Sequence, residues 1–103
     1  MEKEAGHDIN LNIHYTAPDW VWKKIDEVCK TMPYWNEAPG EPNWKGEGIA
    51  LSLSVEPGGV QIFGSMQGKI WGGWYSELKE KLTEALGYEI GEPEDGCDFK
   101  YDW

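Results

Sequence analysis

The sequence contains no arginine, although it has nine lysines and nineteen acidic residues, which give a formal net charge of −10. Proteins that bind nucleic acids rely on basic patches, and on arginine to contact phosphates and guanine. An anionic membrane surface would also repel this chain. We therefore expect neither nucleic acid nor membrane as a partner, and the negative charge would suit a basic protein. The alternative is that the negative charge serves only solubility.

Long apolar runs and cysteines are also scarce. No run approaches the ~18 residues of a transmembrane helix, and the acidic start MEKEAGHDIN is unlike a secretory signal, unless one has already been removed. The two cysteines, Cys29 and Cys97, are fewer than the disulfide framework of a small secreted domain usually needs. We expect two free thiols and a cytoplasmic protein, and a bridge between the two cysteines is the alternative.

No group of residues matches a catalytic or metal-binding pattern. His14 is the only histidine in a predicted strand or helix, and the serines expected on its face lie in no nucleophile motif. The histidines and cysteines are too far apart for a zinc site, and the acidic segment 92–98 does not follow the EF-hand pattern. We therefore predict no catalytic residue, no metal and no cofactor, and favour a protein that is not an enzyme, with an enzyme as the alternative.

Hydrophobic periodicity predicts one α+β domain in residues 8–103, after a flexible tail in residues 1–7. The expected elements, in chain order, are a strand at 8–15, a helix at 16–32, strands at 49–56 and 60–67, a helix at 68–87, and extended segments at 88–90 and 97–103. Their order, β-α-β-β-α-β, predicts a ferredoxin-like fold: a four-stranded antiparallel sheet with two helices on one face.

Two details of this predicted sheet follow from the residue pattern. The first and third strands would be central, and the last strand is the least secure element because it could be split. The glycines of PGG at 57–59 predict a tight hairpin in which Val55 faces Ile62. In this arrangement the apolar faces of the strands turn toward both helices.

Seven tryptophans are more than a core of this size needs, and several have no enforced inward position. Trp35 and Trp44 lie at the ends of a segment rich in proline, glycine and acids, within a long predicted loop at 33–48. Trp35 closely follows the helix end at Pro33, so we expect it to anchor the loop, whereas Trp44 is expected to bind a partner. The predicted binding residues are His14, Trp20, Tyr34, Trp35, Glu41, Trp44 and Phe63.

Three hypotheses for the function follow from these features. The first is a non-enzymatic protein-binding domain; inhibitors and immunity proteins of bacterial toxins share its size and acidity. The second is a ferredoxin-like small-ligand domain or cofactor-less enzyme, with a pocket between the sheet and the 33–48 loop. In that pocket His14 and Tyr34 would be the polar groups and Trp35 the wall. The third is a module that only oligomerises, for instance as a homodimer.

Overall fold

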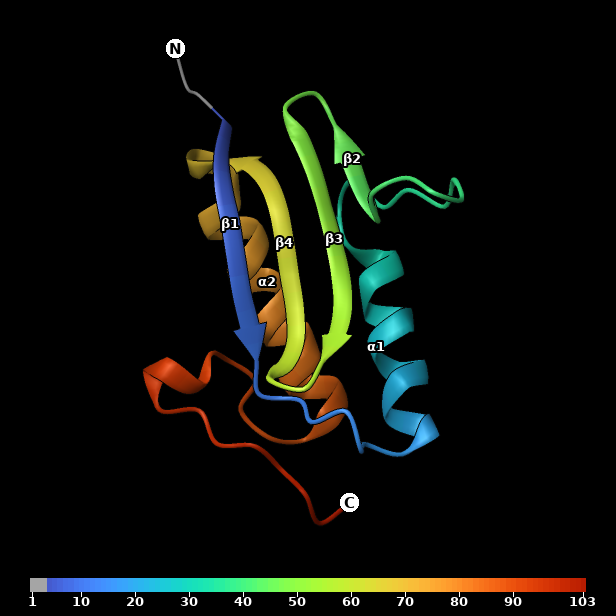
Figure 1. Cartoon of the computed structure of the whole chain (residues 1–103), viewed down its shortest axis with the longest axis vertical. Coiled ribbons are helices and arrows are strands. Elements are labelled where there is room, and N and C mark those ends of the chain that lie inside the picture. Colours follow the sequence, from blue (N-terminus) through green and yellow to red (C-terminus); the bar gives the residue numbers. More distant parts are fainter. Residues whose placement is uncertain (1–3) are drawn as a thin grey trace.

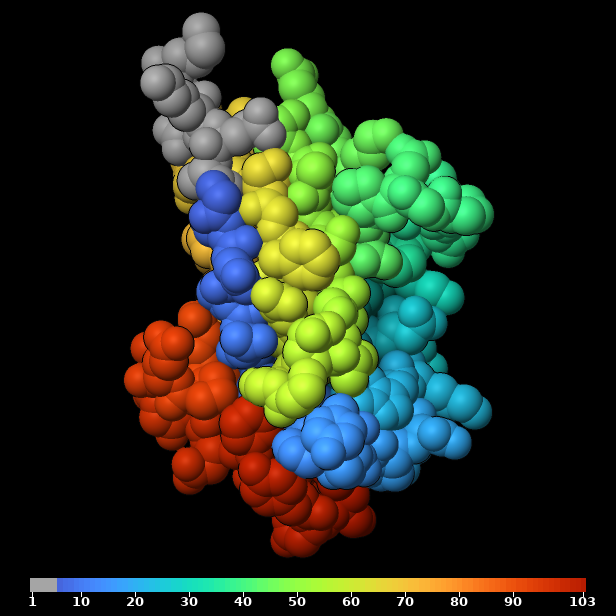
Figure 2. All heavy atoms as spheres, in the orientation of Figure 1, coloured from blue at the N-terminus to red at the C-terminus, as the bar shows by residue number. Residues whose placement is uncertain are grey.

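The computed structural model describes residues 4–103 and shows a mixed α+β fold, with a four-stranded antiparallel sheet and two α-helices (Figure 1). Its elements are β1 (Glu4–Leu11), α1 (Asp19–Thr31), β2 (Trp44–Gly46), β3 (Ile49–Glu56), β4 (Gly59–Gln67), α2 (Gly68–Leu86) and a short 3₁₀ helix (Pro93–Asp95). In this view α2 lies behind the sheet, and α1 lies beside β3, below β2. The other face of the sheet is open, as the space-filling view from the same side shows (Figure 2).

The ferredoxin-like topology is not confirmed, because the strand order is β1-β4-β3-β2. β1, predicted to be central, is an edge strand, and β2 forms the other edge from within the predicted 33–48 loop. The predicted last strand is wrong: residues 97–103 form no strand. Only one backbone hydrogen bond of the structure, from the amide of Asn12 to the carbonyl of Gly91, ties the C-terminal segment to the end of β1. The C-terminal segment therefore does not extend the sheet.

The first strand begins and ends earlier than predicted. It starts at Glu4, so the predicted tail contributes residues 4–7 to the sheet, while residues 1–3 lie outside the described residues. The ring of His7 stacks on Trp71 of α2 at 3.9 Å, and its Nε2 lies 2.9 Å from the carbonyl oxygen of Met66. These contacts fix the start of the strand against both β4 and α2.

The hairpin between β3 and β4 is confirmed, but its register differs from the predicted one. Glu56 pairs with Gly59 across a two-residue turn, so Val55 faces Val60 rather than Ile62. Gly59 is part of β4 and has a φ of 126°, and a Cβ there would lie 2.2 Å from the carbonyl oxygen of Leu11. Only glycine fits against β1 at this point. The turn is formed by residues 57 and 58, one residue earlier in the sequence than a turn at the two glycines.

The core fills the space between the sheet and the helices. The apolar stripe of α1 is buried, as predicted, and α2 contributes Trp74, Tyr75, Leu78, Leu82 and Leu86. Cys29 and Cys97 are both free, which confirms the prediction of free thiols. Burial, with a smaller effect of Asp26, raises the pKa of the Cys29 thiol to about 12, so it is a poor nucleophile at neutral pH. Within residues 4–103, neither α-helix is long and apolar enough to cross a membrane.

Candidate functional site

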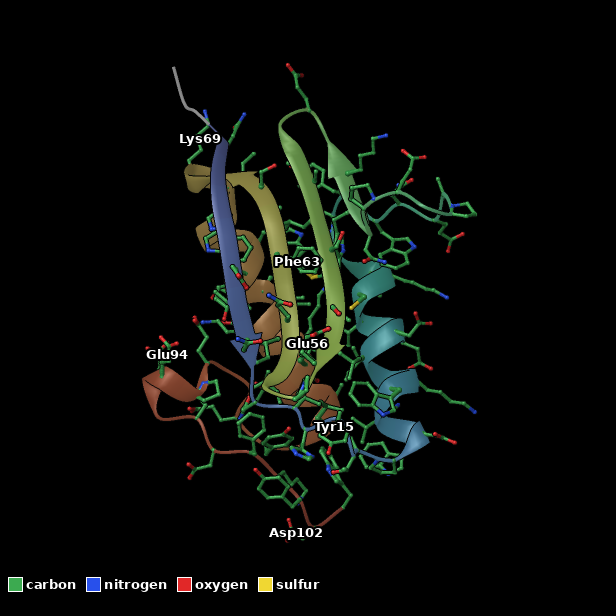
Figure 3. The ribbon with its side chains drawn as sticks, viewed as in Figure 1. Tyr15, Glu56, Phe63, Lys69, Glu94 and Asp102 are labelled. Carbon is green, nitrogen blue, oxygen red and sulfur yellow. The ribbon has the colours of Figure 1, made fainter. Side chains whose placement is uncertain are left out.

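The open face of the sheet carries one large apolar side chain, Phe63, near its centre (Figure 3). Asp8 on β1 and Ser52 on β3 lie directly opposite Phe63 in the register, so all three side chains point to the same face. Phe63 is 38% exposed, and the helices pack against the other face. Phe63, one of the predicted binding residues, therefore lies on the outer face among polar residues.

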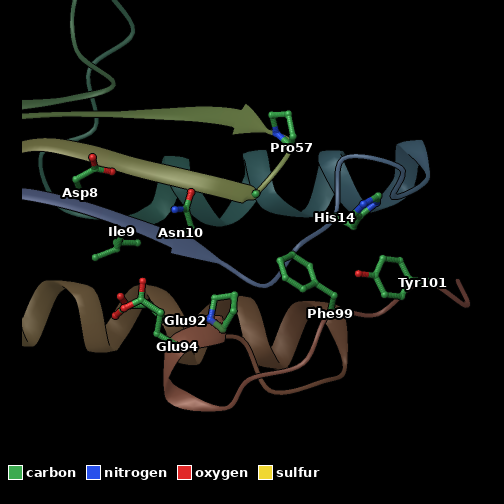
Figure 4. A pocket seen from close by; sticks show the side chains of 11 residues that line it. Asp8, Ile9, Asn10, His14, Pro57, Glu92, Glu94, Phe99 and Tyr101 are labelled. Carbon is green, nitrogen blue, oxygen red and sulfur yellow. The ribbon is translucent and has the colours of Figure 1, made fainter.

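A cavity of about 410 Å³ adjoins this face, at the end of β1 (Figure 4). We call it the end cavity. Its walls are formed by β1, the β3–β4 turn and the C-terminal segment. The residues that line it include Asp8, His14, Glu92, Glu94, Phe99 and Tyr101. Its volume lies within the roughly 300–1,000 Å³ typical of small-ligand sites. Because Asp8 belongs to both surfaces, the cavity and the open face form one continuous surface.

Three aromatic rings form one side of the end cavity. The ring of Tyr101 lies 4.9 Å from that of His14, edge to face, and 6.2 Å from that of Phe99, nearly parallel. His14 follows β1, where it lies within hydrogen-bond distance of the Thr16 hydroxyl, with Nδ1 and Oγ1 2.6 Å apart. His14 is therefore not on the open face beside the serines, as predicted, but at the mouth of the cavity with two aromatic side chains of the C-terminal segment.

The charge of the end cavity is negative. Three of its lining residues are carboxylates, and no lysine lines it in the described part of the chain. Asp8 accepts a hydrogen bond from Gln61 at 2.6 Å, and Glu92 accepts one from the Tyr75 hydroxyl at 3.1 Å. Burial, followed by the charge of Glu92, raises the pKa of Tyr75, so Tyr75 stays a neutral donor. Glu94 makes no hydrogen bond or ion pair with any residue between 4 and 103.

The buried side chain of Asn12 makes three hydrogen bonds to the C-terminal wall of this cavity. Its Nδ2 donates to the carbonyl oxygens of Glu89 and Asp98 at 2.8 and 2.7 Å, and its Oδ1 accepts from the Gly91 amide at 2.8 Å. The Tyr88 hydroxyl donates to the backbone carbonyl of Asn12 at 2.7 Å. Asn12 is fully buried, so these bonds satisfy the polar groups of its side-chain amide, which water does not reach. The predicted strand at 8–15 would instead place Asn12 on its polar face.

The prediction for the loop tryptophans is wrong for Trp44. Trp44 lies in β2 and is fully buried: its Nε1 donates to the Cys29 carbonyl at 3.3 Å, and its ring meets Trp74 at 5.0 Å. A partner therefore has no access to it. Trp35 forms an isolated β-bridge with Trp44 and is half-buried, its ring 5.8 Å away. The predicted loop thus contains β2 and is closed by the Trp35–Trp44 bridge, while residues 36–43 between them form no helix or strand.

The other predicted binding residues are dispersed. Trp20 is 48% exposed, and its ring meets Trp103 edge-on at 5.6 Å. Tyr34 is also exposed, and its φ of 76° is the only positive one of a non-glycine residue in the described part of the chain. Glu41 pairs with Lys45 in the same hairpin. The structure therefore brings none of these three residues to Phe63 or to the end cavity.

A second, smaller cavity lies where a pocket under the 33–48 loop was predicted. It measures about 180 Å³ and is lined by Trp35, as predicted, together with α1 residues such as Cys29. His14 and Tyr34 are not among its lining residues. In residues 4–103 no group of three or more His, Cys, Asp or Glu side chains is arranged to hold a metal ion.

The residues of the end cavity that sequence reasoning missed are Glu92, Glu94, Phe99 and Tyr101. Their sequence signal was ambiguous, since alternating aromatics at 99–103 also suit a strand and acids in a turn are usually only solvated. Nothing in the sequence places this segment next to His14. Comparisons of the chain with models of protein families, with curated proteins and with solved structures found no match.

Proposed function

We propose that this protein is a small non-enzymatic domain that binds a basic protein partner on the open face of its sheet. The observation that carries the proposal is the position of Phe63, exposed near the centre of a polar face that neither helix covers. An aromatic side chain surrounded by polar groups is typical of the residues that dominate interfaces. An inhibitor or immunity-type protein of a bacterial toxin is the most specific form of this proposal, supported by small size and acidity.

The charge of this surface favours a basic partner. Asp8 and Glu56 lie on the open face. The adjoining end cavity contributes two further carboxylates, those of Glu92 and Glu94. With a formal net charge of −10, the whole chain would attract a positive protein over a distance set by the ionic strength. The same charge opposes the pairing of two copies of this chain.

The proposal is tested by capturing partners on the immobilised protein from a lysate of the source organism, at low and at high salt. We expect a basic protein that is retained better at low salt, and Phe63→Ala should weaken its binding about tenfold or more. Dissociation constants are measured by calorimetry with the purified partner. Since Phe63 is already partly exposed, circular dichroism should show an unchanged fold.

Trp20→Ala and Tyr34→Ala are the matched controls, because both remove an exposed aromatic ring away from the open face. These two variants should bind as the wild-type protein does. Loss of binding in either control, with Phe63→Ala unaffected, would place the interface elsewhere. Capture of no partner at either salt concentration would contradict a protein-binding function altogether.

Small-ligand binding is the second candidate function, favoured by the cavity of about 180 Å³ beside Trp35. This function does not depend on the ferredoxin-like topology. The cavity beside Trp35 is smaller than the roughly 300–1,000 Å³ of typical ligand sites. A compound that raised the melting temperature of the wild-type protein, but not of Trp35→Ala, would favour it over protein binding.

A further inference from the structure

We propose that the end cavity binds an arginine side chain of the basic partner. This inference rests on the proposed function, since it names the group that such a partner would insert next to the open face. Three features of the site support it together: a cavity, a wall of aromatic rings and a charge of one sign.

The aromatic wall suits a flat cation. Phe99 and Tyr101 lie nearly parallel, with an interplanar angle of 24°, and His14 meets Tyr101 edge-on at 68°. Tyr101 is 65% exposed, so the face of its ring is accessible from the solvent. A guanidinium group stacks on such faces through cation–π attraction, and its planar shape suits this better than the compact ammonium group of lysine.

The carboxylates supply the opposite charge and the hydrogen-bond acceptors. In Figure 4 the carboxylates of Glu92 and Glu94 project from the C-terminal segment toward β1. Glu94 is exposed and makes no hydrogen bond or ion pair within the described residues, so its two oxygens remain available for a bidentate bond to a guanidinium group. No lysine among the described lining residues competes for them.

A second copy of the chain cannot be the occupant, because the sequence contains no arginine. The cavity is also continuous with the open face through Asp8, so one partner can cover Phe63 and insert a side chain here. The geometry therefore points to a different, positively charged protein. Its arginine would enter between the aromatic wall and the carboxylates.

The experiment titrates ¹⁵N-labelled protein with three blocked tripeptides, acetyl-Gly-Xaa-Gly-amide, in which Xaa is arginine, lysine or citrulline. Citrulline keeps the planar shape of arginine without its charge. We expect the arginine peptide to bind most tightly, with amide shifts at Phe99 and Tyr101, and the citrulline peptide to bind most weakly. Binding of the arginine peptide should weaken as salt is raised.

Two variants test the two parts of the cavity, and a third is the control. Glu94→Gln and Tyr101→Leu should each weaken binding of the arginine peptide by roughly two- to fivefold. Both positions are exposed, so the fold should survive. Glu47→Gln removes one exposed carboxylate from the β2–β3 turn, at the opposite end of β3, and should change nothing.

The two proposals fail separately. If the arginine peptide shifts no amide at the cavity, or if the citrulline peptide binds equally well, the arginine site is overturned, even if a partner is still captured through Phe63. Equal binding of lysine and arginine would overturn the preference for a guanidinium group. If the arginine peptide binds as expected while Phe63→Ala keeps full affinity for the partner, only the open-face interface is overturned.

Discussion

Replacing Trp44 by alanine is expected to lower the free energy of unfolding by about 3–5 kcal/mol, the usual cost of removing a buried large aromatic side chain. Trp44 is completely buried and meets both Trp35 and Trp74 edge-to-face, so its removal leaves a cavity between the edge of the sheet and α1. A domain of this size is stabilised by only about 5–15 kcal/mol in total. The variant should therefore be close to unfolding at moderate temperature.

Urea denaturation followed by far-ultraviolet circular dichroism measures this loss without relying on tryptophan fluorescence, which the substitution itself changes. Trp20→Ala is the control: Trp20 is 48% exposed, and its loss should cost at most about 1 kcal/mol. A Trp44→Ala protein as stable as the wild type would show that β2 does not pack as described.

Replacing Asn12 by alanine is expected to cost about 2–4 kcal/mol and to release the C-terminal segment. The substitution leaves the Gly91 amide and the carbonyls of Glu89 and Asp98 without their partner. A buried group left unsatisfied costs ~1–3 kcal/mol, and water can reach the two half-buried carbonyls. Urea denaturation measures the loss, and hydrogen exchange at Gly91 reports the release directly.

Two further variants separate hydrogen bonding from shape. Asn12→Asp keeps the shape and the acceptor for Gly91 but replaces both donated hydrogens by a charged oxygen that faces two carbonyls, so it should also be destabilised. Asn10→Ala removes an exposed amide two residues earlier on the same strand and should change stability by less than about 0.5 kcal/mol. If Asn12→Asp were as stable as the wild type, the hydrogen bonds would not be what holds the segment.

The helices and the hairpin could be predicted from sequence because their signals are local. In α1, Val21, Ile25 and Cys29 recur on one face, and all three are buried. β2 could not be predicted, since its three residues are too few for a period of two to appear. Trp44, set between Asn43 and Lys45, looks like an exposed loop residue, and only its long-range contact with Trp74 reveals its burial.

The candidate site shows the same division between local and long-range information. Phe63 could be placed on the outer face because the alternation along β4 decides which way each side chain points. The end cavity could not be predicted, because the strand pattern was extended through Asn12 and His14 although β1 ends at Leu11. Once the strand ends, alternation no longer determines burial, and the buried amide of Asn12 holds the C-terminal segment next to the end of β1.

The dependence of the end cavity on Asn12 also has a consequence for the order of folding. The hydrogen bond from the Gly91 amide to Asn12 joins positions 79 residues apart. Contacts so distant in sequence form late, because closing the long loop between them costs conformational entropy. During synthesis, β1 through β4 can pair once residue 67 has left the ribosome, but Phe99 and Tyr101 emerge more than thirty residues later. A nascent chain would thus display Phe63 before the end cavity exists, and the proposed arginine site would be complete only after translation has passed Tyr101.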